Sequence, residues 1–289
     1  PINEIANQYA QIQSALAGAE RVFEVMDSQP EDEGGTEPFE IENVRGDINF
    51  KDIDFSYVKG EQVLKHFDLW VKSGQKIAIV GATGSGKTTV VNLLTRFYDI
   101  DGGVITLDGQ DIRNIPTKKL RGSIGIVLQD TVIFSDTIAQ NIRYGRTDAT
   151  DEEVVAAAKV ARVDDFASKL SDGYNTMLTE GGSNLSQGQR QLISIARAVL
   201  ADPKILILDE ATSSIDTRTE MHIQEAMVAL MKGRTSLIIA HRLSTIRDAD
   251  KIVVISGGKV VEAGDHDELL AQQGEYYKLY QSQFAGIAT

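Results

Sequence analysis

The 289-residue sequence predicts an α/β fold in which helices cover both faces of a core sheet. Three features lead to this prediction. Short apolar runs at 76–80, 204–208 and 236–240 are typical of strands in a parallel sheet that is covered on both faces. A glycine-rich loop and a helix-compatible stretch follow the first of these runs. Alternating apolar residues from Gly46 to Trp70 instead indicate antiparallel strands.

The composition limits the kinds of function that are open to the chain. A hydrophobic content of 42% supports a sizeable core and excludes disorder as the main state. The net charge of 29 − 42 = −13 opposes a generic affinity for nucleic acid, so any anion site must be local. The absence of cysteine excludes a disulfide partner and a cysteine nucleophile. No apolar run approaches the roughly 18 residues of a membrane span, so we expect the chain as given to be soluble.

The first 27 residues predict one long amphipathic helix. Its apolar residues recur at alternating spacings of three and four, as in a heptad stripe: Ile2, Ile5, Tyr9, Ile12, Leu16, Ala19, Phe23 and Met26. A helix that packs on its own domain and the end of a longer helix are both open interpretations. Residues 28–43 form an acidic segment that includes prolines and glycines, and this segment is expected to be a linker. The domain would then cover 44–285, followed by a tail at 286–289.

After the strand at 76–80, the sequence predicts a loop, a helix over 87–97 and a small β region over 103–128, which turns interrupt. Two capping boxes then mark helix starts. Thr150 and Glu153 precede a helical segment that is expected to extend to residue 170. Ser186 and Gln189 repeat the pattern ahead of a helix that is expected to end near residue 200.

Residues 81–88 match the phosphate-binding pattern G-x-x-x-x-G-K-[ST], between a predicted buried strand and a helix. The glycines let backbone N–H groups form a nest around a phosphate, and the helix N-terminus adds its positive end. Lys87 would reach the β- and γ-phosphates, and the Thr88 hydroxyl would bind Mg²⁺. The residues expected to contact the nucleotide here are Gly81, Ala82, Thr83, Gly84, Ser85, Gly86, Lys87, Thr88 and Thr89.

The apolar run at 204–208 ends in two acids, Asp209 and Glu210. A carboxylate at the end of a parallel strand would meet the metal side of a nucleotide on the neighbouring loop. Asp209 fits a Mg²⁺ ligand and Glu210 a general base. Two acids at a strand end are also compatible with a solvated turn, but the phosphate-binding loop favours the functional interpretation.

Further motifs in a fixed order resemble those of the ATP-binding cassette (ABC) ATPases, in particular the nucleotide-binding domains of bacterial multidrug and lipid exporters. Tyr57 looks like the aromatic residue that stacks on adenine. Gln129 looks like the glutamine that senses Mg²⁺ and couples to the membrane domain. His241 resembles the switch histidine at the γ-phosphate, and Asp216 lies in a stretch similar to the loop that crosses the dimer interface. Each residue taken alone also has an ordinary structural explanation, such as a core tyrosine or a helix cap.

Residues 185–189, Leu-Ser-Gln-Gly-Gln, resemble the signature motif of this family. A serine N-cap, a glycine and a helix start form an anion-binding terminus without lysine. The resemblance assigns Ser186, Gly188 and Gln189 to the nucleotide on a partner domain. Gln187 replaces a consensus glycine and would restrict the backbone there. This favours one half of a heterodimer over a homodimer, although a neutral substitution is also compatible.

The resemblance covers residues 1–285 and implies a P-loop (RecA-like) core with an antiparallel β subdomain and a helical subdomain near 130–190. Residues 1–27 would be the cytoplasmic end of the last transmembrane helix. It further implies that ATP and Mg²⁺ are the cofactors, and that a transmembrane domain and a second nucleotide-binding domain are the partners. The domain would lie on the cytoplasmic side of the cell membrane and hydrolyse ATP to drive export. The implied catalytic residues are Glu210, His241, Lys87 and Gln129, and the implied metal ligands are Thr88, Gln129 and Asp209.

Two other classes of ATP-using protein share part of this pattern. A cassette ATPase of chromosome or DNA-repair machinery predicts a long coiled-coil insertion and a basic face. Only about a hundred residues separate Lys87 from Ser186, and the net charge is −13. A P-loop kinase would leave the signature and the switch histidine without explanation.

Overall fold

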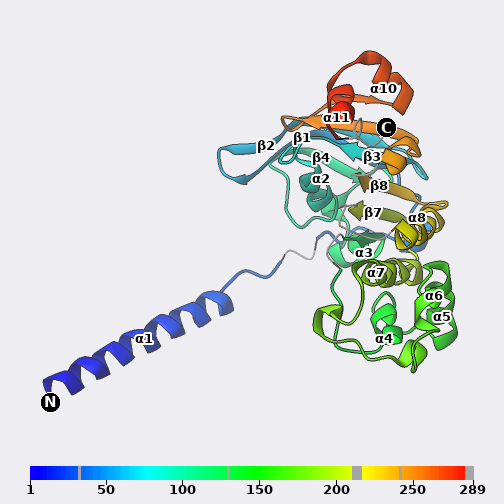
Figure 1. Ribbon diagram of the computed structural model, residues 1–289. Helices are drawn as coiled ribbons and strands as arrows, with labels where there is room; N and C mark the ends of the chain where they lie inside the picture. Colours follow the sequence, from blue (N-terminus) through cyan, green and yellow to red (C-terminus); the bar gives the residue numbers. More distant parts are fainter. Residues whose placement is uncertain (32–33, 129–130, 210–216, 241–242, 284–289) are drawn as a thin grey trace. The chain divides into compact units, whose positions relative to one another are not determined.

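The computed structural model describes residues 1–31, 34–128, 131–209, 217–240 and 243–283 (Figure 1). The chain divides into two units, residues 1–33 and residues 34–289. The first unit contains the predicted N-terminal helix, α1 (Ile2–Met26), which forms one uninterrupted helix with no buried residue. Across the described ranges, no helix combines the length and the apolarity that crossing a membrane requires.

The core of the second unit is a six-stranded sheet in the order β10-β9-β3-β8-β7-β6. Its strands pair in parallel except for the β9–β10 hairpin. The three apolar runs form adjacent strands, which confirms that prediction. The strand bounds are β3 (Lys76–Val80), β6 (Ile124–Val127), β7 (Ile205–Asp209), β8 (Thr235–Ile239), β9 (Lys251–Ser256) and β10 (Lys259–Gly264).

Side chains of this sheet enter two hydrophobic cores alternately. Ile77 and Ile79 of β3 face one core, and Ala78 and Val80 face the other. Because successive side chains of a strand point to opposite faces, both faces of the sheet are covered. This double coverage explains why the parallel strands have no polar alternation.

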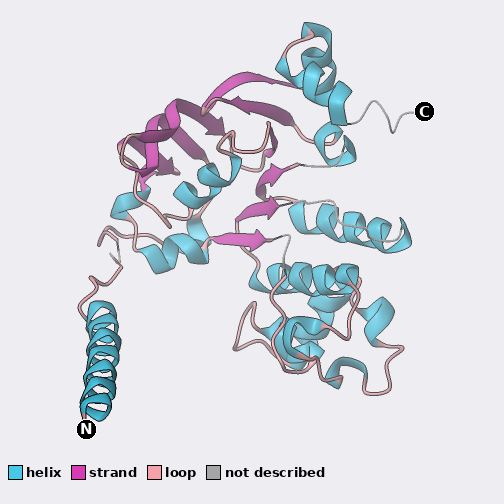
Figure 2. Cartoon of the chain, turned by 60° about the vertical axis from the view of Figure 1, so that its left-hand side comes forward, coloured by secondary structure: helices cyan, strands magenta, loops and turns pink. Residues whose placement is uncertain are grey.

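An antiparallel sheet in the order β2-β1-β4-β5 contributes to one of these cores. Phe50 and Phe67 meet edge to face there, with ring centroids 5.9 Å apart. Figure 2 shows the strands of both sheets in magenta. The bounds are β1 (Ile48–Val58), β2 (Glu61–Val71), β4 (Gly102–Leu107) and β5 (Gln110–Asp111).

The helices of the second unit cover the remaining surfaces, and α4, α5 and α6 gather beside α7 (Figure 1). Both capping boxes are present, at the starts of α5 and α7. The bounds are α2 (Lys87–Leu94), α3 (Thr117–Gly122), α4 (Ile138–Arg143), α5 (Asp151–Val160), α6 (Asp164–Ala167), α7 (Gln187–Ala201), α8 (Thr217–Met231), α9 (Leu243–Arg247), α10 (His266–Gln272) and α11 (Glu275–Gln283).

Three predicted elements differ from the structure. Helix α2 ends at residue 94 instead of 97, and Arg96 beyond it has a φ of +52°. The helical segment that begins at Asp151 stops at residue 160, because Arg162 adopts a φ of +61°, and α6 follows as a separate short helix. The expected β region 103–128 contains α3, which begins after Pro116, and its last strand, β6, joins the parallel sheet.

Residues 34–43 belong to the second unit, which therefore begins ahead of residue 44. Phe39 is buried, and Lys119 Nζ donates to its carbonyl oxygen over 2.7 Å. Gly34 forms an isolated bridge with Pro116. An apolar side chain and backbone bonds thus attach the second half of the expected linker to this unit.

Candidate nucleotide-binding site

The predicted phosphate-binding loop connects β3 to α2, as the motif requires. Gly84 and Gly86 have φ values of +79° and +108°, which L side chains rarely adopt. A Cβ atom at position 86 would lie 2.8 Å from Leu64 Cδ2, and one at Gly81 would lie 2.3 Å from the carbonyl oxygen of Ile255. These glycines are therefore required by the shape of the loop.

Lys87, the first residue of α2, folds back over this loop. Its Nζ donates to the carbonyl oxygens of Gly81 (2.8 Å) and Ala82 (2.9 Å). Burial lowers the pKa of Lys87, and the negative charge of Asp209 opposes this shift. The ammonium group thus lies within the loop and within electrostatic reach of the acid at the end of β7.

Asp209 ends β7, which is separated from β3 by the single strand β8. The carboxyl ends of these parallel strands share one edge of the sheet. Gln129, Glu210 and His241, which the sequence predicts at this edge, lie outside the described residues, as does Asp216.

One polar atom of the loop has no hydrogen-bond partner among the described residues. Ser85 is 7% exposed, and its Oγ has no hydrogen-bond partner among the described residues. A buried hydroxyl without a partner costs free energy, so such a group indicates a missing ligand atom. Phosphate oxygens are hydrogen-bond acceptors. The Ser85 hydroxyl and the glycine-lined loop together therefore fit the phosphates of a nucleoside triphosphate.

Thr88 and Asp209 are the described residues predicted to hold Mg²⁺. Thr88 is exposed in the first turn of α2, and Asp209 is half-buried. Within the described ranges, no group of three or more histidine and acidic side chains is arranged to hold a metal alone. Mg²⁺ usually takes one or two protein oxygens together with substrate phosphates and waters, so this sparse donor set fits Mg²⁺ bound with a nucleotide.

Tyr57 lies near the end of β1, and 44% of it is exposed. Its ring meets Phe55 and Tyr98 edge to face, with centroids 4.8 Å and 4.9 Å away. Its hydroxyl bonds to Thr89 and Asn92 of α2. The alternative of a core tyrosine is not supported by this exposure, and stacking on adenine stays a prediction.

Asn92 is a residue that the sequence analysis missed. It lies three residues after Thr89 on α2, and its Nδ2 donates to Tyr57 Oη over 3.0 Å. Asn92 could have been found from its spacing of three residues from Thr89, because residues three apart share one face of a helix.

The signature residues form the start of α7. Ser186 is the N-cap: its Oγ accepts from Gln189 N (3.2 Å), and its own N donates to Gln189 Oε1 (2.9 Å). Gly188 is buried in the first turn. Gln187 is the first helical residue and has no positive φ. The backbone restriction expected of this glutamine is therefore not found, since every L side chain can adopt a right-handed helical conformation at this position.

A half-buried arginine organises the segment that follows Gln129. Arg197 donates to the carbonyl oxygens of Asn141 (2.6 Å) and Val132 (2.5 Å), and to Asn141 Oδ1 (2.7 Å). Its guanidinium lies 5.5 Å from the ring centroid of Phe134, and burial lowers its pKa. These bonds attach the start of the helical region to α7.

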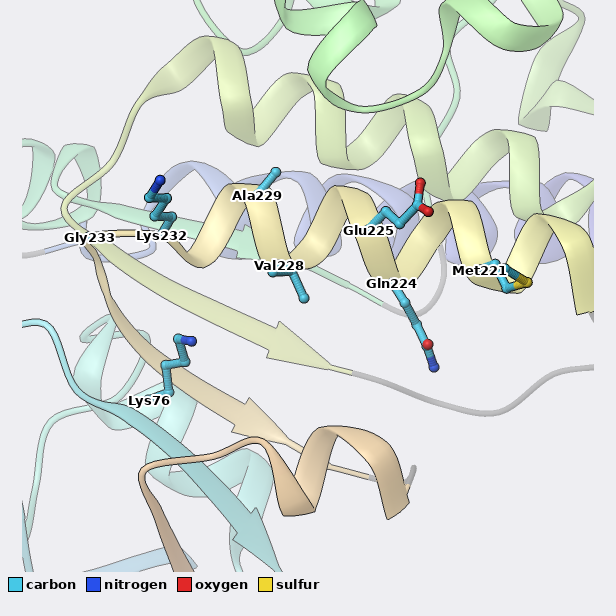
Figure 3. A pocket seen from close by; sticks show the side chains of 8 residues that line it. All are labelled: Lys76, Met221, Gln224, Glu225, Val228, Ala229, Lys232 and Gly233. Carbon is cyan, nitrogen blue, oxygen red and sulfur yellow. The ribbon is translucent and has the colours of Figure 1, made fainter.

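An open pocket of about 640 Å³ lies elsewhere on the described surface. Figure 3 shows that its labelled side chains come mainly from α8, including Met221 and Val228, with Lys76 across from them. It shares no residue with the loop at 81–88. Volume alone therefore does not identify the nucleotide site in this protein.

Comparison with known proteins places residues 64–213, just over half of the chain, in a family described as "ABC transporter". The ABC transporter ATP-binding protein YfiC of Bacillus subtilis is 56% identical over 98% of the chain and 47% of its own length. A fatty acid ABC transporter ATP-binding/permease protein of Mycobacterium tuberculosis is 52% identical over 96% of the chain and 44% of its own length. An ATP-dependent lipid A-core flippase of Syntrophus aciditrophicus is 49% identical, over 98% and 47% respectively.

A solved structure, a bacterial Atm1-family ABC exporter with ATP bound, matches with a TM-score of 0.82 and 40% identity. The match covers 96% of this chain and 48% of that one, so the chain spans about half the length of the relatives it matches. These relatives are transporters, which argues against the DNA-repair alternative. The chain belongs to the ABC transporter family, as its ATP-binding domain.

Proposed function

We propose that this chain is the ATP-hydrolysing motor domain of an ABC exporter. The observation that carries the proposal is the phosphate-binding loop, where the Ser85 hydroxyl has no partner among the described residues and Lys87 bonds to the loop within electrostatic reach of Asp209. The reaction would be ATP + H₂O → ADP + phosphate, coupled to export across the cell membrane. The relatives, which include a lipid A-core flippase and an Atm1-family exporter, support this role.

Within the site, Lys87 would stabilise the charge that develops on the transferred phosphoryl group. Mg²⁺, held by Thr88 and Asp209, would supply further neutralisation of the phosphates. Glu210 would orient or deprotonate the attacking water, as a general base at the end of β7. Gln129 and His241 would complete the site from the ends of β6 and β8.

The partners we propose are a transmembrane domain and a second nucleotide-binding domain, with the chain on the cytoplasmic side of the membrane. Two such domains would close head to tail, so that the Ser186 end of α7 in one caps the nucleotide of the other. A helix N-terminus with a satisfied capping box presents backbone N–H groups to an anion. Closure on ATP and release after hydrolysis would supply the conformational change, because the closed state binds ATP better.

The test is Mg²⁺-dependent release of inorganic phosphate by the purified 289-residue chain, with Lys87→Ala as the variant. We expect Lys87→Ala to abolish the activity, and the matched control Lys118→Ala to retain it, because Lys118 is exposed and has no side-chain partner among the described residues. Equal activity in Lys87→Ala and in the control would refute the assignment of the site. Transfer of phosphate to a small molecule instead of water would support the kinase alternative.

A further inference from the structure

The tyrosine predicted to stack on adenine is held by its hydroxyl as well as by its ring. Asn92 Nδ2 donates to Tyr57 Oη over 3.0 Å, and Tyr57 Oη donates to Thr89 Oγ1 over 3.2 Å. Asn92 and Thr89 are three residues apart on α2, so both face β1 from one side of the helix. The hydrogen bonds thus run from Asn92 through Tyr57 to Thr89, which is the residue next to Thr88.

Thr89 has a hydrogen to donate at the end of this chain. A hydroxyl carries one hydrogen and two acceptor lone pairs. Because Tyr57 already donates to Thr89 Oγ1, the hydrogen of Thr89 is left for another acceptor, and no residue in the described ranges provides one. Thr89 is 4% exposed, so bulk water has little access.

A second hydroxyl, in the loop that precedes α2, is in a similar position. Ser85 Oγ is buried and has no partner within the described ranges. Two buried hydroxyls whose hydrogens find no acceptor among the described residues indicate a ligand rich in acceptor oxygens. Among nucleotide groups, the phosphates have this chemistry.

The neighbouring rings hold the Tyr57 hydroxyl in position. Phe55 and Tyr98 meet the Tyr57 ring nearly perpendicularly, at 85° and 88°, which is a favourable aromatic geometry. Phe55 is 2% exposed and belongs to the core, so it is a fixed support. The ring is therefore held by two neighbouring rings and by its hydroxyl, while 44% of the residue stays exposed and open to an adenine base.

We propose that Tyr57 is a positioning residue for the phosphates. Its hydroxyl, oriented by Asn92, directs the hydroxyl hydrogen of Thr89 to a phosphate oxygen of the bound nucleotide. The ring serves the base and the hydroxyl serves the phosphates, so that one residue connects both ends of the nucleotide. This inference rests on the proposed function, because both use the same nucleotide site.

The test separates the ring from the hydroxyl with a probe that has no base. The 289-residue chain is titrated with ATP and with inorganic triphosphate in a calorimeter. Tyr57→Phe keeps the ring, and we expect it to weaken both ligands by the same factor, roughly 3- to 10-fold. Tyr57→Ala should weaken triphosphate by that factor and ATP by more, because stacking is lost as well.

Tyr98→Phe is the matched control. It removes a hydroxyl from the adjacent ring, and the described residues offer that hydroxyl no partner, so both ligands should bind as in the wild type. The proposal is overturned if Tyr57→Phe binds both ligands normally, or if it weakens ATP while triphosphate is unaffected. A wild-type chain that binds neither ligand would instead refute the proposed function.

A double-mutant cycle with Thr89→Val provides an independent measurement on ATP alone. Both substitutions break the same hydrogen bond, so Tyr57→Phe should cause no further loss in a chain that already carries Thr89→Val. Fully additive losses would mean that the two hydroxyls act separately, which contradicts the proposal.

Discussion

Replacing Ser85 by alanine should stabilise the nucleotide-free chain and weaken ATP binding at the same time. The Ser85 hydroxyl is 7% exposed and has no hydrogen-bond partner among the described residues. A buried polar group in this situation costs about 1 to 3 kcal/mol. The substitution removes one oxygen atom and leaves the backbone unchanged, so the free energy of unfolding should rise by up to about that amount.

The affinity for ATP should change in the opposite direction. In the proposed site, the Ser85 hydroxyl donates to a phosphate oxygen, and a hydrogen bond to a charged group contributes about 1.5 to 3 kcal/mol. Since each 1.4 kcal/mol corresponds to a factor of ten, Ser85→Ala should bind ATP roughly 10- to 150-fold more weakly. A residue that only supports the fold would not move the two quantities in opposite directions.

The measurements are urea unfolding without nucleotide and a calorimetric titration with ATP. Ser123→Ala is the control, because Ser123 is fully buried but its Oγ donates to the carbonyl oxygen of Leu120 over 2.6 Å. That variant should lose about 1 kcal/mol of stability and keep its affinity for ATP. Two results would refute this role of Ser85: a Ser85→Ala chain that is destabilised like the control, or one that binds ATP as tightly as the wild type.

Other side chains give equally specific expectations. Gln187→Gly should change ATP turnover less than about twofold, because Gln187 already has a helical backbone and a glycine at a helix start changes stability only slightly. A large gain in turnover would instead indicate an impaired signature motif and a heterodimer. Arg197→Met should lower the free energy of unfolding by about 2 kcal/mol, since it removes charge-assisted hydrogen bonds to the buried residue Asn141, and hydrogen exchange should rise first near Asn141. Burial, together with the charge of Arg247, lowers the pKa of His266 below 6.5. The stability that neutral His266 contributes is therefore complete above pH 6.5 and is lost as the pH falls below it. His266→Asn should weaken this pH dependence in urea unfolding, and an unchanged dependence would exclude His266 as its source.

The parallel strands, the phosphate-binding loop and both capping boxes could be predicted because each depends on neighbouring residues. The apolar run 76–80 and the motif that follows it contain their own explanation, and so does the pairing of Ser186 with Gln189. Such short-range chemistry leaves a pattern in the sequence that does not depend on the rest of the fold.

Features that depend on distant residues could not be predicted in this way. Arg162 interrupts the expected helix with a positive φ, and its guanidinium pairs with Glu225 of α8 over 2.7 Å. The bond from Tyr57 to Thr89 joins positions 32 residues apart. In both cases the partner belongs to another element, so the local sequence contains no trace of the contact.

We propose that this domain hydrolyses ATP with Glu210, the residue that follows Asp209 in the sequence, as the general base. The direct measurement compares Glu210→Gln with the wild-type chain in phosphate release and in retention of bound ATP. Glutamine keeps the shape of the side chain and removes the base, which should lower hydrolysis on the order of 10² to 10⁴-fold while ATP stays bound in a closed dimer. Glu152→Gln, at an exposed position on α5, should behave as the wild type. Near-normal hydrolysis by Glu210→Gln would contradict the account and assign the base to another residue.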